Sequence, residues 1–202
     1  AHGKAAHAGN AHGEGVNAIH GLSLLVPRIE ALTDEARGVS LNVGLFRGGT
    51  AKNTVPDHAT IEIDGRFVRG EDGPWLLDTL AAIVADPFEG REPSPPRLRA
   101  LRFALGGGIT RPPMEPTERT QALRAAYEAR AAAAGLGVGE APLQGGGSDA
   151  CLLAAAGVPS LDGLGPYGRH FHDRKEWCSL ASLRRRTEAL ATFLAEPEAC
   201  ST

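Results

Sequence analysis

Two patterns of hydrophobic and polar positions follow one another along the first half of the chain. Apolar residues recur at three- and four-residue spacing from Val16 to Leu32, which predicts an amphipathic helix. Residues 39–46 and 59–67 instead alternate apolar and polar side chains, and each segment predicts a strand. We therefore expect a helix followed by two strands that are joined through the Gly48–Pro56 loop.

Three further segments extend this pattern: a strand over residues 3–9, a helix from Pro74 to about Val84, and a strand over Leu98–Leu105. Proline suits the first turn of a helix, where its missing N–H is harmless. The resulting order is strand, helix, strand, strand, helix, strand, which is typical of the split βαβ sandwich. The sequence therefore predicts a ferredoxin-like domain within residues 1–110, a four-stranded antiparallel sheet covered on one face by two helices.

The pattern changes after the glycine triplet at residues 106–108. Three helices and one short buried strand are expected beyond it, over residues 117–134, 148–156 and 180–194 and at Val158–Asp162. Helices and strands joined by tight glycine loops are typical of an α/β layer, but a single strand does not make a sheet. We therefore expect residues 111–202 to be part of an α/β domain whose remaining strands lie in preceding sequence or in another chain.

Composition narrows the classes of function. The chain of 202 residues is 22% charged with a net charge of −3 and is 5% aromatic, which argues against a nucleic-acid partner. The one basic run, Arg184–Arg186, lies inside a helical pattern and is expected to be a solvated helix face. No apolar run reaches the length of roughly 18 residues that a membrane span needs. Three widely spaced cysteines form neither a disulfide framework nor a metal knuckle, and a cytoplasmic location fits them.

Three segments combine reactive side chains with glycine. Small residues flank His7 at the end of the first expected strand, so a substrate can approach its ring closely. The segment from Gln144 to Ala150 places glycines at a helix entry, which is either an anion site or a plain turn capped by Ser148. The segment from Gly168 to Trp177 carries two histidines after the expected buried strand, and it is either a fragment of a larger metal site or no site.

Five motifs in the same order resemble the C-terminal part of one family, the dinuclear zinc hydrolases of the aminoacylase and carboxypeptidase G type. They are Gly3–Gly9 with Gly15–Ile19, Asn42–Gly44 with Gly48–Pro56, Asp64-Gly65-Arg66, Gly145–Ala150, and His172 with Glu176. The resemblance covers nearly the whole chain. It implies a lid and dimerisation domain over residues 1–110, followed by the C-terminal portion of a catalytic α/β domain over residues 111–202.

The resemblance also implies roles for five residues. His7 matches a lid histidine that polarises the scissile carbonyl in the partner subunit's active site. Asn53 matches a lid residue that contacts the substrate or its developing oxyanion. Arg111 matches an arginine that holds the substrate carboxylate, a role that suits its forked guanidinium. Gly147 matches a backbone contact to substrate, and His172 matches the last zinc ligand.

The family's other metal ligands, and the glutamate that activates its water, precede the lid and are absent from this sequence. The chain begins like the middle of a longer sequence, since Ala1–Gly9 has no apolar stretch typical of a signal peptide. The expected function is zinc-dependent hydrolysis of an amide or peptide bond next to a free carboxylate, by a homodimer of which this chain is a part. Two alternatives stay open, a non-catalytic dimerisation or regulatory module and a split enzyme whose N-terminal half is a separate chain.

Overall fold

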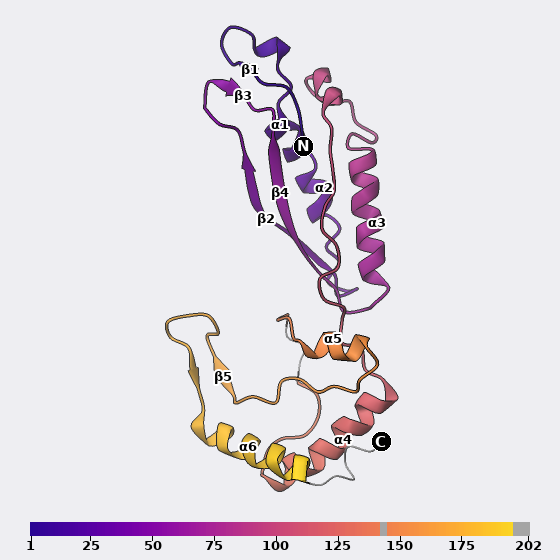
Figure 1. Cartoon of the computed structure of the whole chain (residues 1–202), viewed down its shortest axis with the longest axis vertical. Coiled ribbons are helices and arrows are strands. Elements are labelled where there is room, and N and C mark those ends of the chain that lie inside the picture. The colour runs from indigo at the N-terminus through magenta and orange to yellow at the C-terminus, as the bar shows by residue number, and fades with distance from the viewer. Residues whose placement is uncertain (142–144, 196–202) are drawn as a thin grey trace. The chain divides into compact units, whose positions relative to one another are not determined.

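The computed structural model describes residues 1–141 and 145–195. The chain divides into two compact units, Ala1–Thr110 and Arg111–Thr202. The first unit holds a long hairpin and helix α3 (Asp72–Ala85) (Figure 1). The second unit holds helices α4 (Glu118–Ala133), α5 (Ala150–Ala155) and α6 (Leu180–Ala195). Each unit is described by itself below, the second over the residues that the structure describes.

A long antiparallel hairpin is the main element of the first unit. Strand β2 (Ser40–Gly48) pairs with strand β4 (Ala59–Arg66) from Ser40↔Arg66 to Gly48↔Ala59, with a register shift between Val43 and Leu45 (Figure 1). The alternating pattern of the two segments puts apolar side chains on the core face of the pair, as the buried Leu41 and Ala59 show. The two expected strands and their connecting loop are confirmed.

A second, shorter ladder lies at the end of this hairpin. Strand β1 (Ala6–His7) pairs antiparallel with strand β3 (Thr54–Val55), which follows directly on the loop after β2. Upstream of β1, His2 makes single bridges to both His58 and Arg102. The N-terminal segment thus lies between the start of β4 and the stretch around residue 102.

The expected four-stranded sheet is therefore present only as two-stranded ladders and single bridges. The strand predicted over Leu98–Leu105 is wrong at its start, because Pro96–Ala100 forms a 3₁₀ turn and only Arg102 bridges to a neighbour. Pro95 and Pro96 have no N–H to donate to a sheet, and the turn buries Leu98 completely. The coarser prediction is confirmed: the chain is a mixed α/β protein with small antiparallel sheets.

The helix predicted from Val16 to Leu32 is divided in two. Helix α1 (Ala18–Ser23) is capped by Asn17, whose Oδ1 accepts a hydrogen bond of 2.8 Å from the N–H of His20. Helix α2 (Val26–Glu30) begins after two intervening residues, with Pro27 in its first turn. Proline cannot donate to a carbonyl in the preceding turn, so one continuous helix is broken in front of it.

Helix α3 (Asp72–Ala85) completes the core of the first unit and confirms the helix predicted from Pro74. It contributes Leu76 and Ile83 to a cluster of buried apolar side chains that the two short helices and the hairpin share. The remaining buried members are Val16, Ala18, Leu22, Leu25, Ile29, Val39, Leu41, Ala59, Phe88, Leu98 and Leu101. This core holds the hairpin and its loop in place.

The second unit is built on a helix pair. Helix α4 (Glu118–Ala133) is capped by Thr117, whose Oγ1 accepts a hydrogen bond of 3.1 Å from the N–H of Thr120. It packs on helix α6 (Leu180–Ala195), and the rings of Tyr127 and Phe193 meet edge to face with centroids 5.8 Å apart. Both helices are where the sequence predicts them. The buried apolar residues of this cluster are only Tyr127, Ala131, Ala189 and Phe193 among those the structure describes.

Smaller elements of the second unit differ from expectation. Helix α5 (Ala150–Ala155) is shorter than the predicted helix over 148–156. The predicted strand at Val158–Asp162 is wrong, since it has no pairing partner within the described residues. An unexpected hairpin of β5 (Gly168–Arg169) and β6 (Trp177–Cys178) follows instead. Among the described residues, no helix is long and apolar enough to cross a membrane.

Candidate functional site

The turn after β1 fixes the His7 ring. Its Nδ1 accepts hydrogen bonds of 3.1 Å from the N–H of Gly9 and of 3.1 Å from the N–H of Asn10. Because Nδ1 accepts both bonds, the neutral ring carries its proton on Nε2. The side chain is exposed, so Nε2–H is available to an external acceptor. A Cβ at position 9 would lie 3.4 Å from His7 Cε1, which is close to ordinary van der Waals contact with the ring.

The loop that carries Asn53 lies beside this turn. His7 pairs with Thr54 across the β1–β3 ladder, and the N–H of Ala8 donates to the carbonyl of Asn53 over 2.9 Å. Both side chains, His7 and Asn53, are exposed. The structure thus brings together two predicted site residues that are 46 positions apart in the sequence.

Arg111 and Gly147 are also neighbours, in the second unit. A Cβ at position 147 would lie 3.2 Å from Arg111 Cδ, so the absence of a side chain lets the arginine stem pass. Arg111 Nη1 donates a hydrogen bond of 2.6 Å to Asp149 Oδ1. The Arg111 side chain is 45% exposed and that of Asp149 is 87% exposed, so this ion pair exchanges easily with a competing carboxylate.

Asp149 is a residue that sequence reasoning missed. Ser148 was the expected cap, and its Oγ does accept a bond of 3.1 Å from the N–H of Ala150. The residue in the N-cap position is Asp149, whose carboxylate makes no capping bond and is paired with Arg111 instead. Asp149 could be seen beside the glycines in the sequence, but its pairing could not, because Arg111 is 38 positions away. Gln144, the first residue of the predicted motif, lies outside the described residues.

His172 lies in the seven-residue loop between β5 and β6. Among the described contacts, none joins His172 to Arg111 or Asp149. Its φ is 65°, and that of His170 is 62°. These are the two non-glycine residues with positive φ in the described parts of the chain. A left-handed backbone conformation costs on the order of 1 kcal/mol or more at each non-glycine residue, and residues with this conformation are frequent at functional sites. The loop is held by bonds from Asp173 N to His170 O and from Glu176 N to Asp173 O, each of 3.0 Å.

The side chains of the described residues do not form a zinc site by themselves. Within residues 1–141 and 145–195, no group of three or more His, Cys, Asp and Glu lies close enough to hold a metal ion. A catalytic zinc takes about three protein ligands and keeps a position for water. The role of His172 as a zinc ligand therefore stays a prediction, and such a site would need further ligands from beyond the described residues.

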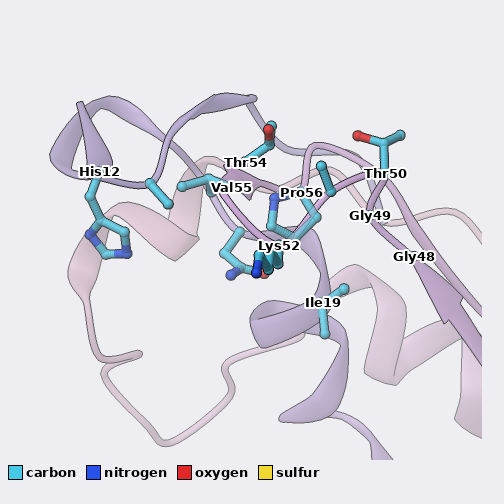
Figure 2. Close-up of a pocket in the computed structure, with 12 residues that line it drawn as sticks. His12, Ile19, Gly48, Gly49, Thr50, Lys52, Thr54, Val55 and Pro56 are labelled. Atoms are coloured by element: carbon cyan, nitrogen blue, oxygen red, sulfur yellow. The ribbon is translucent and has the colours of Figure 1, made fainter. Parts of the chain in front are cut away.

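The first unit also has a pocket that the sequence did not reveal. It has a volume of about 580 Å³ and lies between the Gly48–Pro56 loop, the start of α1 and the turn around His12 (Figure 2). Neither His7 nor Asn53 lines it. The only hint in the sequence was the cation Lys52 within a glycine-rich loop.

Sequence and fold comparisons agree on one group of proteins. Residues 1–92 match the family model of the peptidase dimerisation domain. Carboxypeptidase G2 of Pseudomonas sp. (strain RS-16) is 30% identical over 195 residues, which cover 95% of this chain and 44% of that protein. The chain therefore spans less than half the length of this relative.

Solved structures agree on the fold. Aminopeptidase PepT from Bacillus cereus superposes with a TM-score of 0.62 at 21% identity, over 100% of this chain and 50% of that one. A tripeptidase from Staphylococcus aureus gives 0.62 at 22% identity, over 95% of this chain and 48% of that one. An aminobenzoyl-glutamate utilization protein from Klebsiella pneumoniae gives 0.57 at 23% identity, over 76% of this chain and 37% of that one.

Proposed function

This chain is a relative of the M20 peptidases over their C-terminal part, and from that relationship we propose that it serves in zinc-dependent hydrolysis of an amide bond next to a free carboxylate. The observation that carries the proposal is the His7 turn. Two backbone N–H groups occupy Nδ1, so the turn presents a neutral imidazole with an outward Nε2–H donor. A fixed donor of this kind suits a carbonyl oxygen that gains negative charge.

Asn53 is proposed to act with His7. Its loop is tied to the His7 turn by the bond from Ala8 N to Asn53 O, 2.9 Å long. The amide of an asparagine offers two N–H donors without a charge. Two neutral donors on adjacent segments would favour the charge of the transition state over the uncharged substrate, which is the requirement for lowering a barrier. We therefore propose that His7 and Asn53 together stabilise the oxyanion of a substrate that is bound mainly by other residues.

Arg111 is proposed to select substrates that end in a free carboxylate, as N-acyl amino acids and peptides do. Its guanidinium is already paired with a carboxylate, that of Asp149, at 2.6 Å. Both partners are solvent-accessible, so a substrate carboxylate can replace Asp149 at little cost. Gly147 leaves room for the arginine stem itself, and its backbone is proposed to contact such a group. The name of the carboxypeptidase relative is in keeping with this substrate class.

A homodimer through the first unit is proposed as the working assembly. Within the described residues, strand β2 pairs only with β4, and no strand covers its other edge. The side chains of Thr33 and Glu30 take the N–H groups of Leu41 and Val43 there, so the part of this edge that remains open begins after Val43. Leu45 and Phe46 on this strand are 44% and 40% exposed. An unpaired edge with apolar side chains favours a two-fold partner, which covers both. In the proposed dimer the α1–α2 segment lies beside its symmetry mate, and His7 serves the partner subunit's site.

The second unit gives a physical reason to expect more polypeptide around the site. Ten of the fourteen exposed large apolar side chains among the described residues belong to it, including Phe171 and Leu180 at 64% and 67% exposure. Apolar surface of this extent favours a covering partner. We propose that the covering polypeptide, in the same or a separate chain, also supplies the remaining zinc ligands. Zinc bound there would supply a hydroxide near neutral pH.

The alternative is a non-catalytic dimerisation module. One observation favours it: the described residues contain no cluster that could hold a metal ion. A module of this kind has no need for the His7 turn or for two histidines in left-handed backbone, which is why the hydrolytic proposal is preferred.

The 202-residue chain by itself should show negligible hydrolase activity and weak zinc affinity, because one imidazole does not hold a dinuclear site. The assay uses N-acyl glutamates with added zinc, and metal content is measured after dialysis. Two zinc ions per chain that survive dialysis would contradict the proposed division of ligands. The alternative module predicts inactivity as well, so the decisive arm adds the metal-site part. Activity that appears only on that addition supports the enzyme, and continued inactivity supports the module.

His172 rather than His170 should be the zinc ligand. The test needs the extended enzyme, by which we mean a protein that contains this chain together with the metal-site part that its family carries. His172→Ala should lower zinc content and activity together, and His170→Ala should leave zinc content unchanged. The two positions are matched, since both are exposed and both have φ near +60°. Loss of zinc in His170→Ala with full retention in His172→Ala would reverse the assignment.

A further inference from the structure

The pocket of the first unit, here called the Lys52 pocket, is a surface separate from the His7 and Asn53 side chains. Its wall consists of the Gly48–Pro56 loop without Asn53, together with Ala8, His12, Asn17 and Ile19 (Figure 2). Its volume of about 580 Å³ falls within the usual range of pockets for small molecules. The proposed hydrolysis gives this pocket no role.

The lining of the Lys52 pocket is cationic. Lys52 supplies the positive charge, the imidazole of His12 also lines the pocket, and the lining contains no aspartate or glutamate. Among the residues that the structure describes, no carboxylate lies within ion-pair distance of the Lys52 ammonium. An ammonium in a concave wall without a counter-charge raises the local concentration of anions.

His12 is oriented as a further donor. Arg97 Nη2 lies 3.2 Å from His12 Nδ1. A guanidinium has N–H donors and no acceptor, so Nδ1 must be the acceptor in this contact. The proton of the neutral ring is then on Nε2, and the Arg97 guanidinium lies at the Nδ1 side of the ring. Among the described residues, no carboxylate lies within ion-pair distance of Arg97 either.

The loop adds backbone donors. Gly49 has a φ of +74°, which turns the chain away from β2 at the rim of the pocket. Over the described residues, the N–H groups of Thr50, Ala51 and Lys52 donate to no backbone carbonyl. Backbone N–H groups in consecutive turn residues form concave donor surfaces that suit anions. Lys52, His12 and this stretch of backbone therefore offer donors without an opposing acid.

We propose that the Lys52 pocket binds a small anionic molecule through a carboxylate or phosphate group. The ammonium of Lys52 supplies the charge, and His12 Nε2–H and the Thr50–Lys52 backbone supply directed hydrogen bonds. The proposal does not rest on hydrolysis at the His7 turn, and it is testable with the 202-residue chain.

The test is a titration of the isotope-labelled chain followed by amide chemical shifts at constant ionic strength. Glutarate is the probe in one arm and inorganic phosphate in the other. Saturable shifts at Ala8, His12 and residues 48–54 are expected in at least one arm, and the arm that saturates at lower concentration identifies the anion. Lys52→Ala should weaken the midpoint by about tenfold or more, the usual effect of losing one hydrogen bond to a charged group. Lys4→Ala is the matched control, since Lys4 is an exposed lysine of the same unit outside the lining.

Three results would overturn the proposal. The first is a linear drift of shifts in both arms with no saturation. The second is an equal midpoint for the wild-type chain and Lys52→Ala. The third is an equal loss in Lys4→Ala, which would indicate general charge attraction. A well-dispersed spectrum of each variant before titration shows that the fold is intact, so that a lost signal reports the pocket.

Discussion

Replacing His7 by alanine should lower amide hydrolysis by the extended enzyme about a hundredfold, with zinc content unchanged. The reason is the outward Nε2–H donor that the turn holds in place through the Gly9 and Asn10 N–H bonds. The loss should fall mainly on kcat, because a donor to a developing oxyanion matters most in the transition state. Steady-state kinetics on an N-acyl glutamate and metal analysis are the measurements.

Two variants separate this role from a structural one. His7→Gln keeps an N–H donor at a similar distance from the backbone and should recover part of kcat. His58→Ala removes another exposed histidine of the same unit and should leave kcat within about twofold, the ordinary effect of a surface change. A His7→Ala enzyme with normal kcat would remove His7 from the proposed mechanism, and zinc loss in the same variant would reassign it as a ligand.

Replacing Arg37 by leucine should lower the free energy of unfolding of the first unit by about 3 kcal/mol. Asp72 is fully buried at the start of α3, and its Oδ1 lies 2.5 Å from Arg37 Nε. Its Oδ2 has no hydrogen-bond partner in the described structure. Arg37 also stacks over Trp75, with its Cζ 4.1 Å from the ring centroid. Without the Arg37 guanidinium, the Asp72 carboxylate would stay buried with no ionic partner, and an unpaired buried charge strongly destabilises the folded state.

Urea unfolding measures this loss, and two further variants test its cause. Asp72→Asn in the Arg37→Leu background removes the buried charge and should recover part of the stability. Arg69→Ala is the control, because its pair with Glu71 is 3.9 Å long with both side chains mostly exposed, and it should cost less than about 1 kcal/mol. Equal and small effects of Arg37→Leu and Arg69→Ala would show that Asp72 does not depend on its partner.

Elements with strong local patterns were predictable from the sequence. The β2–β4 hairpin follows from period-two alternation, and α4 follows from its length and from Thr117 in front of it. In these cases the information lies within the segment itself. The wrong predictions have two causes: a partner that lies far away in the sequence, or a proline inside the predicted element. A strand at Val158–Asp162 needs a neighbour that the described residues do not supply, and Pro27 breaks a helix that periodicity alone extends.

The candidate site was predictable as residues but not as contacts. Motif resemblance named His7, Asn53, Arg111, Gly147 and His172, and their roles stay predictions. Which of them meet depends on tertiary structure: His7 with Asn53, and Arg111 with Gly147. The acceptor role of His7 Nδ1 and the pairing of Asp149 were not visible, because each depends on the path of a turn or on a partner far along the chain. The Lys52 pocket was missed for the same reason.

The central claim is that a site is shared between two copies, with His7 from one subunit and His172 from the other. Mixing His7→Ala and His172→Ala forms of the extended enzyme tests it most directly. Each mixed dimer then has one site that combines the intact His172 with the partner's His7. Random exchange of equal amounts should restore about a quarter of wild-type activity per subunit. No recovery above the two separate variants, with mixed dimers shown to form, would contradict the shared site.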